Sequence, residues 1–210
     1  MAAVLVVALG AFVVANQDAQ STAGATGQYT APAANAIAAE GGNVTENTVE
    51  SNASTTKWQG FWGNVSGSLR LGDGSAIFYD WSGVTFQAIY ASPAVAPSFG
   101  SLSGVDAALD LEALDTAFGL TSADADSIAS TMTGNTCVAG TEITAAAGVT
   151  PNGAGAWETC VGDSGALGLG SVVFGTNIAS GEGYNGDTID YQIMVPAQGA
   201  GTDYYFFLEI

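Results

Sequence analysis

Short runs of alternating apolar and polar residues dominate the chain after residue 57. The apolar members of these runs are Leu69 and Leu71; Ile77, Tyr79 and Trp81; Val84, Phe86, Ala88 and Tyr90; Val172 and Phe174; and Ile189, Tyr191, Ile193 and Val195. A period of two places alternate side chains on the same face of a β-strand. Gly72, Asp73 and Gly74 lie between the first two runs and are typical of a hairpin turn. The pattern predicts a mainly antiparallel, β-sandwich-like domain over residues 57–210.

The C-terminal residues continue this pattern with aromatic side chains. Tyr204, Phe206, Leu208 and Ile210 alternate with Tyr205, Phe207 and Glu209, which would lie on the opposite face. Free chain ends fray unless they are packed. The run therefore predicts a final strand that is buried in the sheet.

One stretch in the middle of the chain has a helical period instead. Val105, Leu109, Leu114 and Phe118 recur at helical spacing within residues 104–119. Ser103 is the expected N-cap and Gly119 the expected stop signal. A second, shorter helix is expected over residues 126–132. Together they predict a small helical insertion over about residues 103–132.

The first fifteen residues, MAAVLVVALGAFVVA, are all apolar or glycine. As a helix they span roughly 22 Å, which is shorter than a ~30 Å hydrocarbon core. A secretory signal core, a truncated membrane anchor and the exposed start of a mature pilin-like subunit are all compatible with this stretch. We favour the pilin-like interpretation, because no basic residues precede the segment and the sequence around Ala15 is a poor cleavage site. The expected helix covers residues 1–22, and its assembly face consists of Val4, Leu5, Val6, Val7, Leu9, Phe12, Val13 and Val14.

Residues 23–56 are rich in Gly, Ala and Thr and hold a single aromatic residue, Tyr29. Such a stretch cannot bury enough apolar surface to offset the entropy of ordering it. We predict a linker between the helix and the β-domain. The Ala-rich part, residues 31–39, is alternatively suited to extend the helix or to pack on a neighbouring subunit.

The charge balance excludes several partners. The chain has 20 acidic residues, no histidine and only two basic residues, Lys57 and Arg70, for a formal net charge of −18. Nucleic acid is excluded as a partner because phosphate binding requires several cations, and an anionic membrane surface would repel the domain. Strong negative charge suits molar salt, where screening shortens repulsion. The alternative is an acidic secreted protein from ordinary salt.

The absence of histidine also removes most catalytic arrangements. No Ser-His-Asp or Cys-His system can form, and phosphate-loop and dinucleotide motifs are absent. A carboxylate pair for glycoside hydrolysis remains, with Glu112, Glu142, Glu158 and Glu182 as candidates. A solvated acidic surface explains these residues more simply. We predict a protein that is not an enzyme and has no cofactor.

Two acidic groups have oxygen ligands suited to calcium. Asp124, Asp126 and Ser127 form one, and Asp187 and Asp190 lie near a Gly-rich turn. Neither group belongs to a twelve-residue calcium loop. Helix capping is the competing explanation for Asp124 and Asp126.

The four tryptophans, Trp58, Trp62, Trp81 and Trp157, are candidates for stacking on sugars. Their alternation with polar residues favours positions in the core instead. We therefore expect all four to be core residues.

Cysteines and glycosylation sequons are typical of an exported protein. Cys137 and Cys160 are expected to form a disulfide that closes a loop of 24 residues, with two buried thiols as the alternative. The bond would contribute roughly 3 kcal/mol in the chain-entropy model. Asn43, Asn52 and Asn64 each begin an Asn-x-Ser/Thr sequon. We expect a glycoprotein.

Several blocks resemble a group of archaeal secreted proteins. They are EGGNVTE (residues 40–46), WQGFWGNVSGSLRL (58–71), YDW (79–81), GYNGDTIDYQIMVP (183–196) and DYYFFLEI (203–210). Asp124, Asp126 and Ser127, ahead of Cys137, fit the middle of the same group. The apolar N-terminus is separately similar to archaeal type IV pilins and archaellins. These resemblances imply an archaeal surface location and no assigned catalytic residues.

The sequence as a whole favours an extracellular, pilin-like structural subunit. Its partners would be copies of itself in a homopolymeric filament, with an acidic β-domain facing outward. The alternative is a membrane-tethered domain for adhesion that binds glycans of a host or neighbouring cell surface. A secreted glycosidase ranks third.

Overall fold

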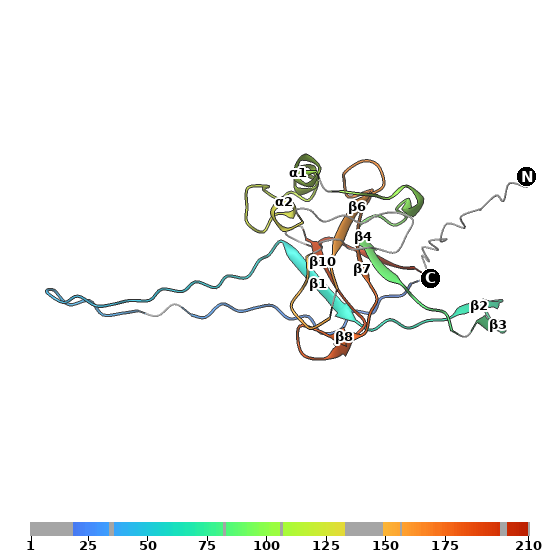
Figure 1. The fold of residues 1–210 in the computed structure, drawn as a ribbon, viewed down its shortest axis with the longest axis horizontal. Helices are drawn as coiled ribbons and strands as arrows, with labels where there is room; N and C mark the ends of the chain where they lie inside the picture. Colours follow the sequence, from blue (N-terminus) through green and yellow to red (C-terminus); the bar gives the residue numbers. More distant parts are fainter. Residues whose placement is uncertain are drawn as a thin grey trace, which may run out of the picture.

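The structure is a computed structural model that describes residues 19–33, 36–81, 83–105, 107–132, 149–155, 157–197 and 201–209 (Figure 1). The described part is mainly β. Its helical segments are α1 (Ala108–Ala117), α2 (Ile128–Thr131) and the 3-10 turn η1 (Phe99–Ser101). Its strands are β1 (Trp58–Gly63), β2 (Leu69–Gly72), β3 (Ile77–Trp81), β4 (Ala88–Ser92), β5 (Ser103–Gly104), β6 (Cys160–Asp163), β7 (Val172–Asn177), β8 (Gly181–Glu182), β9 (Thr188–Ile189), β10 (Tyr191–Pro196) and β11 (Tyr205–Glu209).

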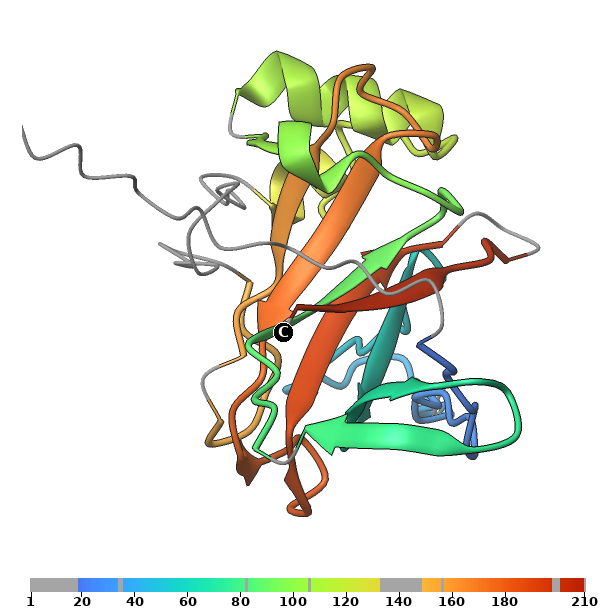
Figure 2. The same cartoon turned by 90° about the vertical axis from the view of Figure 1, so that its right-hand side faces the viewer.

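The strands form several small antiparallel sheets, which confirms the predicted fold class at that level. The largest sheet has the order β11-β4-β7-β6-β5. β1 pairs with β10, β2 with β3, and β8 with β9. Figure 2 shows the helices at one end of the five-stranded sheet, and Figure 1 shows the β2–β3 hairpin projecting away from it.

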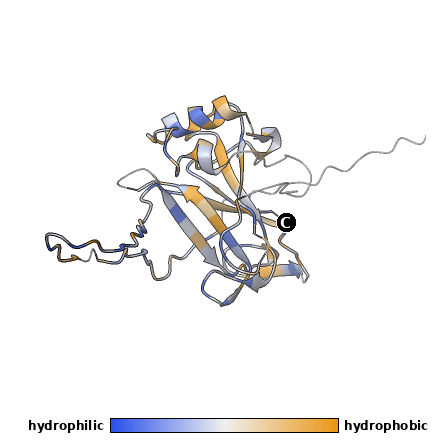
Figure 3. Ribbon diagram, turned by 60° about the vertical axis from the view of Figure 1, so that its left-hand side comes forward, coloured by the Kyte–Doolittle hydropathy of each residue, from blue (hydrophilic) through white to orange (hydrophobic). Residues whose placement is uncertain are grey.

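The core lies between the five-stranded sheet and the β1–β10 pair. β7 is at the centre of the large sheet, and Val172, Val173 and Phe174 on it are fully buried. Phe174 shares a cluster with Ile193 and Val195 of β10. The rings of Phe61 on β1 and Phe206 on β11 meet edge to face at 5.1 Å. In Figure 3, hydrophobic (orange) residues accordingly lie on the central strands and on the helices that pack beside them.

The helical insertion is confirmed, with two differences in detail. Leu114 and Phe118 are buried as expected, but Leu109 is 77% exposed and Leu111 takes the inward position. Ser103 is not the N-cap, because it belongs to β5, where it pairs with Asp163 of β6. The helix starts after Ala107. Gly119 follows the helix at φ +65°, the left-handed conformation that ends many helices.

The C-terminal aromatic run forms a strand, as predicted, but this strand is an edge strand. β11 pairs only with β4 among the described strands. Phe207 and Glu209 on one face of β11 are buried, and Phe206 and Leu208 on the other face are half-buried. The Tyr90 hydroxyl donates to the Glu209 carboxylate at 2.7 Å, which explains how an acidic side chain is buried there.

The predicted N-terminal helix falls mostly on residues 1–18, which lie outside the described residues, together with its eight assembly positions. Residues 19–22 were expected to end this helix and are not helical. Most described residues of 19–56 are exposed, and this stretch extends away from the domain and returns to it (Figure 1). We call residues 19–56 the arm. The arm turns at residues 40–43, where Gly42 has the positive φ of a type II turn. Within the described chain, no helix has the length and apolarity that crossing a membrane requires.

Candidate interaction surface

The β2–β3 hairpin is closed by a turn that the sequence specifies locally. The Asp73 carboxylate accepts hydrogen bonds from the Ser75 hydroxyl (2.8 Å) and from the backbone N–H groups of Ser75 (3.1 Å) and Ala76 (2.9 Å). These bonds, the Ser75 hydroxyl first, lower the pKa of Asp73. A Cβ at Gly72 would overlap the Ala76 carbonyl oxygen, so this position requires glycine. The hairpin expected around Gly72, Asp73 and Gly74 is therefore confirmed.

One face of the hairpin is entirely apolar. Leu69 pairs with Trp81 and Leu71 with Tyr79, so these four side chains lie on one face, together with Ile77. Each of the five is between 43% and 56% exposed. The Tyr79 and Trp81 rings contact each other edge to face at 4.9 Å. We call these five residues the hairpin face.

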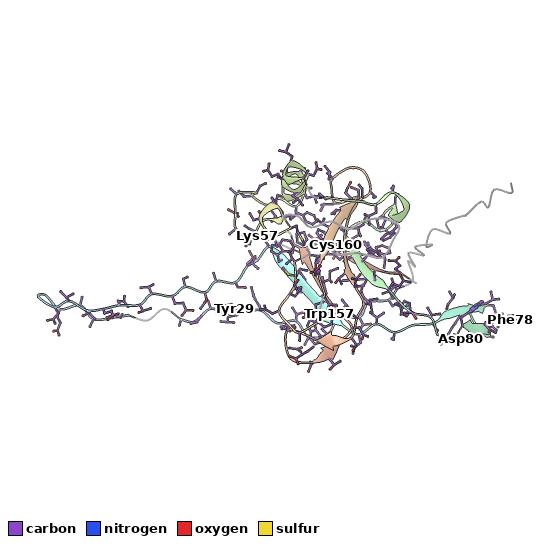
Figure 4. All side chains as sticks on the ribbon, in the orientation of Figure 1. Tyr29, Lys57, Phe78, Asp80, Trp157 and Cys160 are labelled. Atoms are coloured by element: carbon purple, nitrogen blue, oxygen red, sulfur yellow. The ribbon has the colours of Figure 1, made fainter. Side chains whose placement is uncertain are left out.

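The reverse side of the hairpin has a different character. Arg70 pairs with Asp80 across the two strands, and the Arg70 Nε lies 2.9 Å from the Asp80 Oδ2. Phe78 also lies on this side and is 84% exposed. Figure 4 shows Phe78 toward the far end of the projecting hairpin and Asp80 nearer to the domain. The hairpin is thus amphipathic, with a salt-bridged side and an apolar side.

Nothing in the described chain covers the hairpin face. Every residue of β2 and β3 is exposed. An isolated two-stranded hairpin is marginally stable in water, and contiguous apolar patches on a soluble domain usually mark an interaction site. The hairpin face is therefore the candidate functional site of the described chain. The alternating sequence pattern predicts its strands but not their exposure.

A polar cluster around Lys57 holds the end of the arm on the domain. The Lys57 ammonium contacts Asp124 at 2.7 Å and Asp126 at 2.5 Å. The Thr55 hydroxyl donates to Asp126 at 2.7 Å, and the Trp58 indole N–H donates to the Asp126 carbonyl at 2.8 Å. The end of the arm is thus held on the loop between α1 and α2 (Figure 4).

These contacts shift the pKa values of Lys57 and Asp126. The hydrogen bonds that Lys57 donates to Asp124 and Asp126 raise the pKa of Lys57, and the bond that Asp126 accepts from Lys57 lowers the pKa of Asp126. The cluster therefore stabilises the fold above the ordinary aspartate pKa and below the ordinary lysine pKa. That contribution is lost as the pH falls through the lowered pKa of Asp126.

The two proposed calcium groups are engaged otherwise. Asp124 and Asp126 bind Lys57, and the capping role expected of them belongs to Ser127, whose hydroxyl accepts from the Ser130 N–H at the start of α2. Asp190 accepts from the Val65 N–H at 2.9 Å, and Asp187 accepts from the Asn185 side chain at 2.6 Å. In the part of the chain that the structure describes, no three acidic, His or Cys side chains come together as a metal site.

The candidate catalytic carboxylates are dispersed. Glu112 lies on α1 and Glu182 on β8, at opposite ends of the domain in Figure 1. Glu158 is half-buried and lies just before β6. Glu142 lies outside the described residues. Glu112 and Glu182 therefore do not flank a common substrate.

The tryptophans divide into two groups. Trp157 is fully buried and Trp58 is half-buried. Trp62 and Trp81 are 41% and 43% exposed, so the prediction that all four lie in the core was wrong for these two. Trp81 belongs to the hairpin face, and the Trp62 ring meets that of Tyr184 at 5.8 Å on the surface.

The three sequons are all accessible. Asn43 lies at the turn of the arm, Asn52 lies on its returning half, and Asn64 directly follows β1; all three are exposed. Because each offers its side chain to solvent, we expect glycans at these positions in the native protein. Intact mass of protein from its own cells should exceed the polypeptide mass, and Asn-to-Gln variants should each remove one increment. A native mass equal to that of the polypeptide would refute this.

The structure describes one of the two cysteines of the predicted disulfide. Cys160 is fully buried on β6. Cys137 lies outside the described residues, so the bond stays a prediction.

Comparison of the chain with protein-family models, with curated proteins and with solved structures finds no match. The resemblance to archaeal secreted proteins and to pilins thus depends on the sequence blocks alone. A function has to be inferred from the chemistry of this chain.

Proposed function

We propose that this protein is a non-enzymatic structural subunit of an extracellular, pilin-like archaeal surface filament. The observation that supports this most directly is the hairpin face, five apolar side chains that nothing in the described chain covers. An isolated two-stranded hairpin is marginally stable in water, and a second surface that covers its apolar face stabilises it. A subunit of an assembly has such a surface available to it.

The remaining architecture fits this role. The domain is β-sandwich-like, with the β1–β10 pair packed against the five-stranded sheet. The acidic surface keeps unassembled copies apart in solution. The apolar segment at the start of residues 1–18 acts as the assembly helix in this proposal, with Val4, Leu5 and Phe12 among the side chains buried between copies. At roughly 25 cal/mol per Å2 of apolar area, that burial strongly favours assembly.

The test is to examine filaments sheared from the surface of the native cells by negative-stain microscopy and to identify their main protein by mass spectrometry. We expect this chain to dominate thin filaments. A strain that lacks the gene should lose those filaments. If the protein occurs only in the membrane fraction and the deletion strain keeps its filaments, the proposal is wrong.

A tethered domain that binds glycans is the second candidate. It is favoured by the exposed pair of Trp62 and Tyr184, because exposed aromatic rings stack on sugars. Glycan-array binding that is lost in Trp62→Ala and retained in Trp81→Ala would support this candidate.

A further inference from the structure

We propose that the hairpin face docks against the same face of a second copy of this chain, so that two subunits pair through their hairpins. This inference deepens the proposed function, on which it rests, by naming the partner of the hairpin face. Three properties of the described residues support it: the apolar area, the charge distribution and the symmetry of the face.

The apolar area is sufficient for a specific contact. The five side chains are each about half exposed. Side chains of this size bury roughly 100–250 Å2 when fully covered, so the face offers on the order of 500 Å2. Two such faces together bury about 1,000 Å2, which is the lower limit for a specific protein interface.

The charge distribution selects a second copy over other partners. The hairpin face has no charged side chain, and Arg70 on the reverse side is paired with Asp80. A basic partner would be drawn to the acidic residues elsewhere on the chain, and an anionic lipid surface would be repelled by the net charge of −18. An uncharged apolar face matched in size is present on every other copy.

The projection of the hairpin reduces repulsion between the two acidic bodies. The hairpin extends away from the rest of the domain (Figures 1 and 2). A strand of five residues is about 16 Å long. That length exceeds the Debye length, which is about 8 Å at physiological ionic strength and shorter still in molar salt. Contact through the hairpins therefore keeps most of the charge of one copy screened from the other.

The arrangement of the face suits a two-fold contact. The pair of Leu71 and Tyr79 is central, with Leu69 and Trp81 on one side and Ile77 on the other. A two-fold axis through the centre places the Leu71–Tyr79 pair of one copy on that of the next. Such a contact closes on itself and yields dimers. Growth of a filament would then depend on a different contact, the one proposed for the apolar segment within residues 1–18.

Substitutions on the two sides of the hairpin provide a matched test. In the unassembled full chain in molar salt, Leu71→Ser with Tyr79→Ser should raise the dimer dissociation constant, measured by sedimentation equilibrium, at least about 30-fold. Phe78→Ser is the control, since Phe78 is the most exposed large apolar side chain of the two strands but lies on the reverse side. It should change the constant less than about 3-fold. A monomeric wild-type chain, or equal effects of both changes, would overturn the proposal.

Cross-linking identifies the occupant directly. Tyr79→Cys should give covalent dimers on mild oxidation, whereas Phe78→Cys should not. A Tyr79→Cys chain that cross-links to an engineered cysteine within its own residues 1–18 would show that the chain covers its own hairpin, and would overturn the proposal. Binding of the wild-type chain to neutral phosphatidylcholine vesicles that Leu71→Ser with Tyr79→Ser abolishes would overturn it in favour of lipid.

The outcomes separate this inference from the proposed function. Filaments on cells together with a monomeric unassembled chain would refute the hairpin pairing alone. A hairpin-dependent dimer without surface filaments would refute the filament alone.

Discussion

Replacing Trp157 by alanine should lower the free energy of unfolding by about 4 kcal/mol, as expected for removal of a fully buried aromatic side chain. Trp157 is completely buried, and its indole N–H lies 2.9 Å from the Ala179 carbonyl and 2.8 Å from that of Asp190. The side chain therefore joins the segment before β6 to those that flank the β8–β9 pair (Figure 4). Its loss leaves a cavity and two carbonyl groups without this donor.

Two further variants separate packing from hydrogen bonding. Trp157→Phe keeps much of the ring but removes the donor, and should cost about 2 kcal/mol. Gly155→Ala should also destabilise the domain, because a Cβ at Gly155 would overlap the Trp157 ring. Urea unfolding followed by circular dichroism measures all three variants. If Trp157→Ala cost less than about 1 kcal/mol, the segment around residue 157 would not be part of the cooperative core.

Local patterns predicted most of the elements that the structure contains. The Gly72-Asp73-Gly74 turn was predictable because the Asp73 carboxylate bonds within three residues of itself. The C-terminal strand and the helical insertion followed from hydrophobic periods of two and of about 3.6. In each case the determinant is contained in a few consecutive residues.

Exposure was not predictable from the same patterns. The alternation of Ile77, Tyr79 and Trp81 matches that of Ile189, Tyr191 and Ile193, yet the first run is exposed and the second is buried or half-buried. Alternation shows that a strand has an apolar face, but not what covers it. For the same reason Trp81 was assigned to the core. The uncovered face is therefore the finding that only the three-dimensional structure supplies.

Contacts between residues far apart in sequence were also beyond the sequence analysis. Lys57 meets Asp124 and Asp126, which follow it by 67 and 69 residues. A chain with only two basic residues offers one indirect signal, since each cation has many acidic partners available. That signal names Lys57 but cannot select Asp124 and Asp126 from twenty acidic residues.

Asp115 is a buried acidic residue that the sequence did not single out. It lies in the last turn of α1 and is fully buried. Its carboxylate accepts hydrogen bonds from the backbone N–H groups of Ile128 (2.6 Å) and Ala129 (3.1 Å) at the start of α2. The first N–H groups of a helix have no partner within the helix, so this carboxylate supplies one for two of them. Asp115 thereby fixes α2 against α1.

Asp115→Ala should therefore cost about 3 kcal/mol, because it removes a buried carboxylate that accepts from the N–H groups of Ile128 and Ala129. Asp115→Asn retains one acceptor oxygen in a side chain of the same shape and should cost about half as much. Glu112→Ala, on the exposed side of the same helix, should change stability by less than about 0.5 kcal/mol. Equal costs for Asp115→Ala and Glu112→Ala in urea unfolding would contradict the capping role.

Asp115→Ala should also loosen the arm, because Asp124 and Asp126 lie on the loop that leads into α2. That loop holds Lys57, and the Trp58 indole N–H donates to the Asp126 carbonyl. If Asp115 positions α2, then Asp115→Ala should shift the Trp58 indole signal in the NMR spectrum toward that of Asp126→Ala, even under conditions in which the variant stays folded. An unchanged Trp58 signal would mean that the arm is held by the Lys57 cluster independently of the helices. A shifted signal would show that the helical insertion determines how the arm leaves the β-domain.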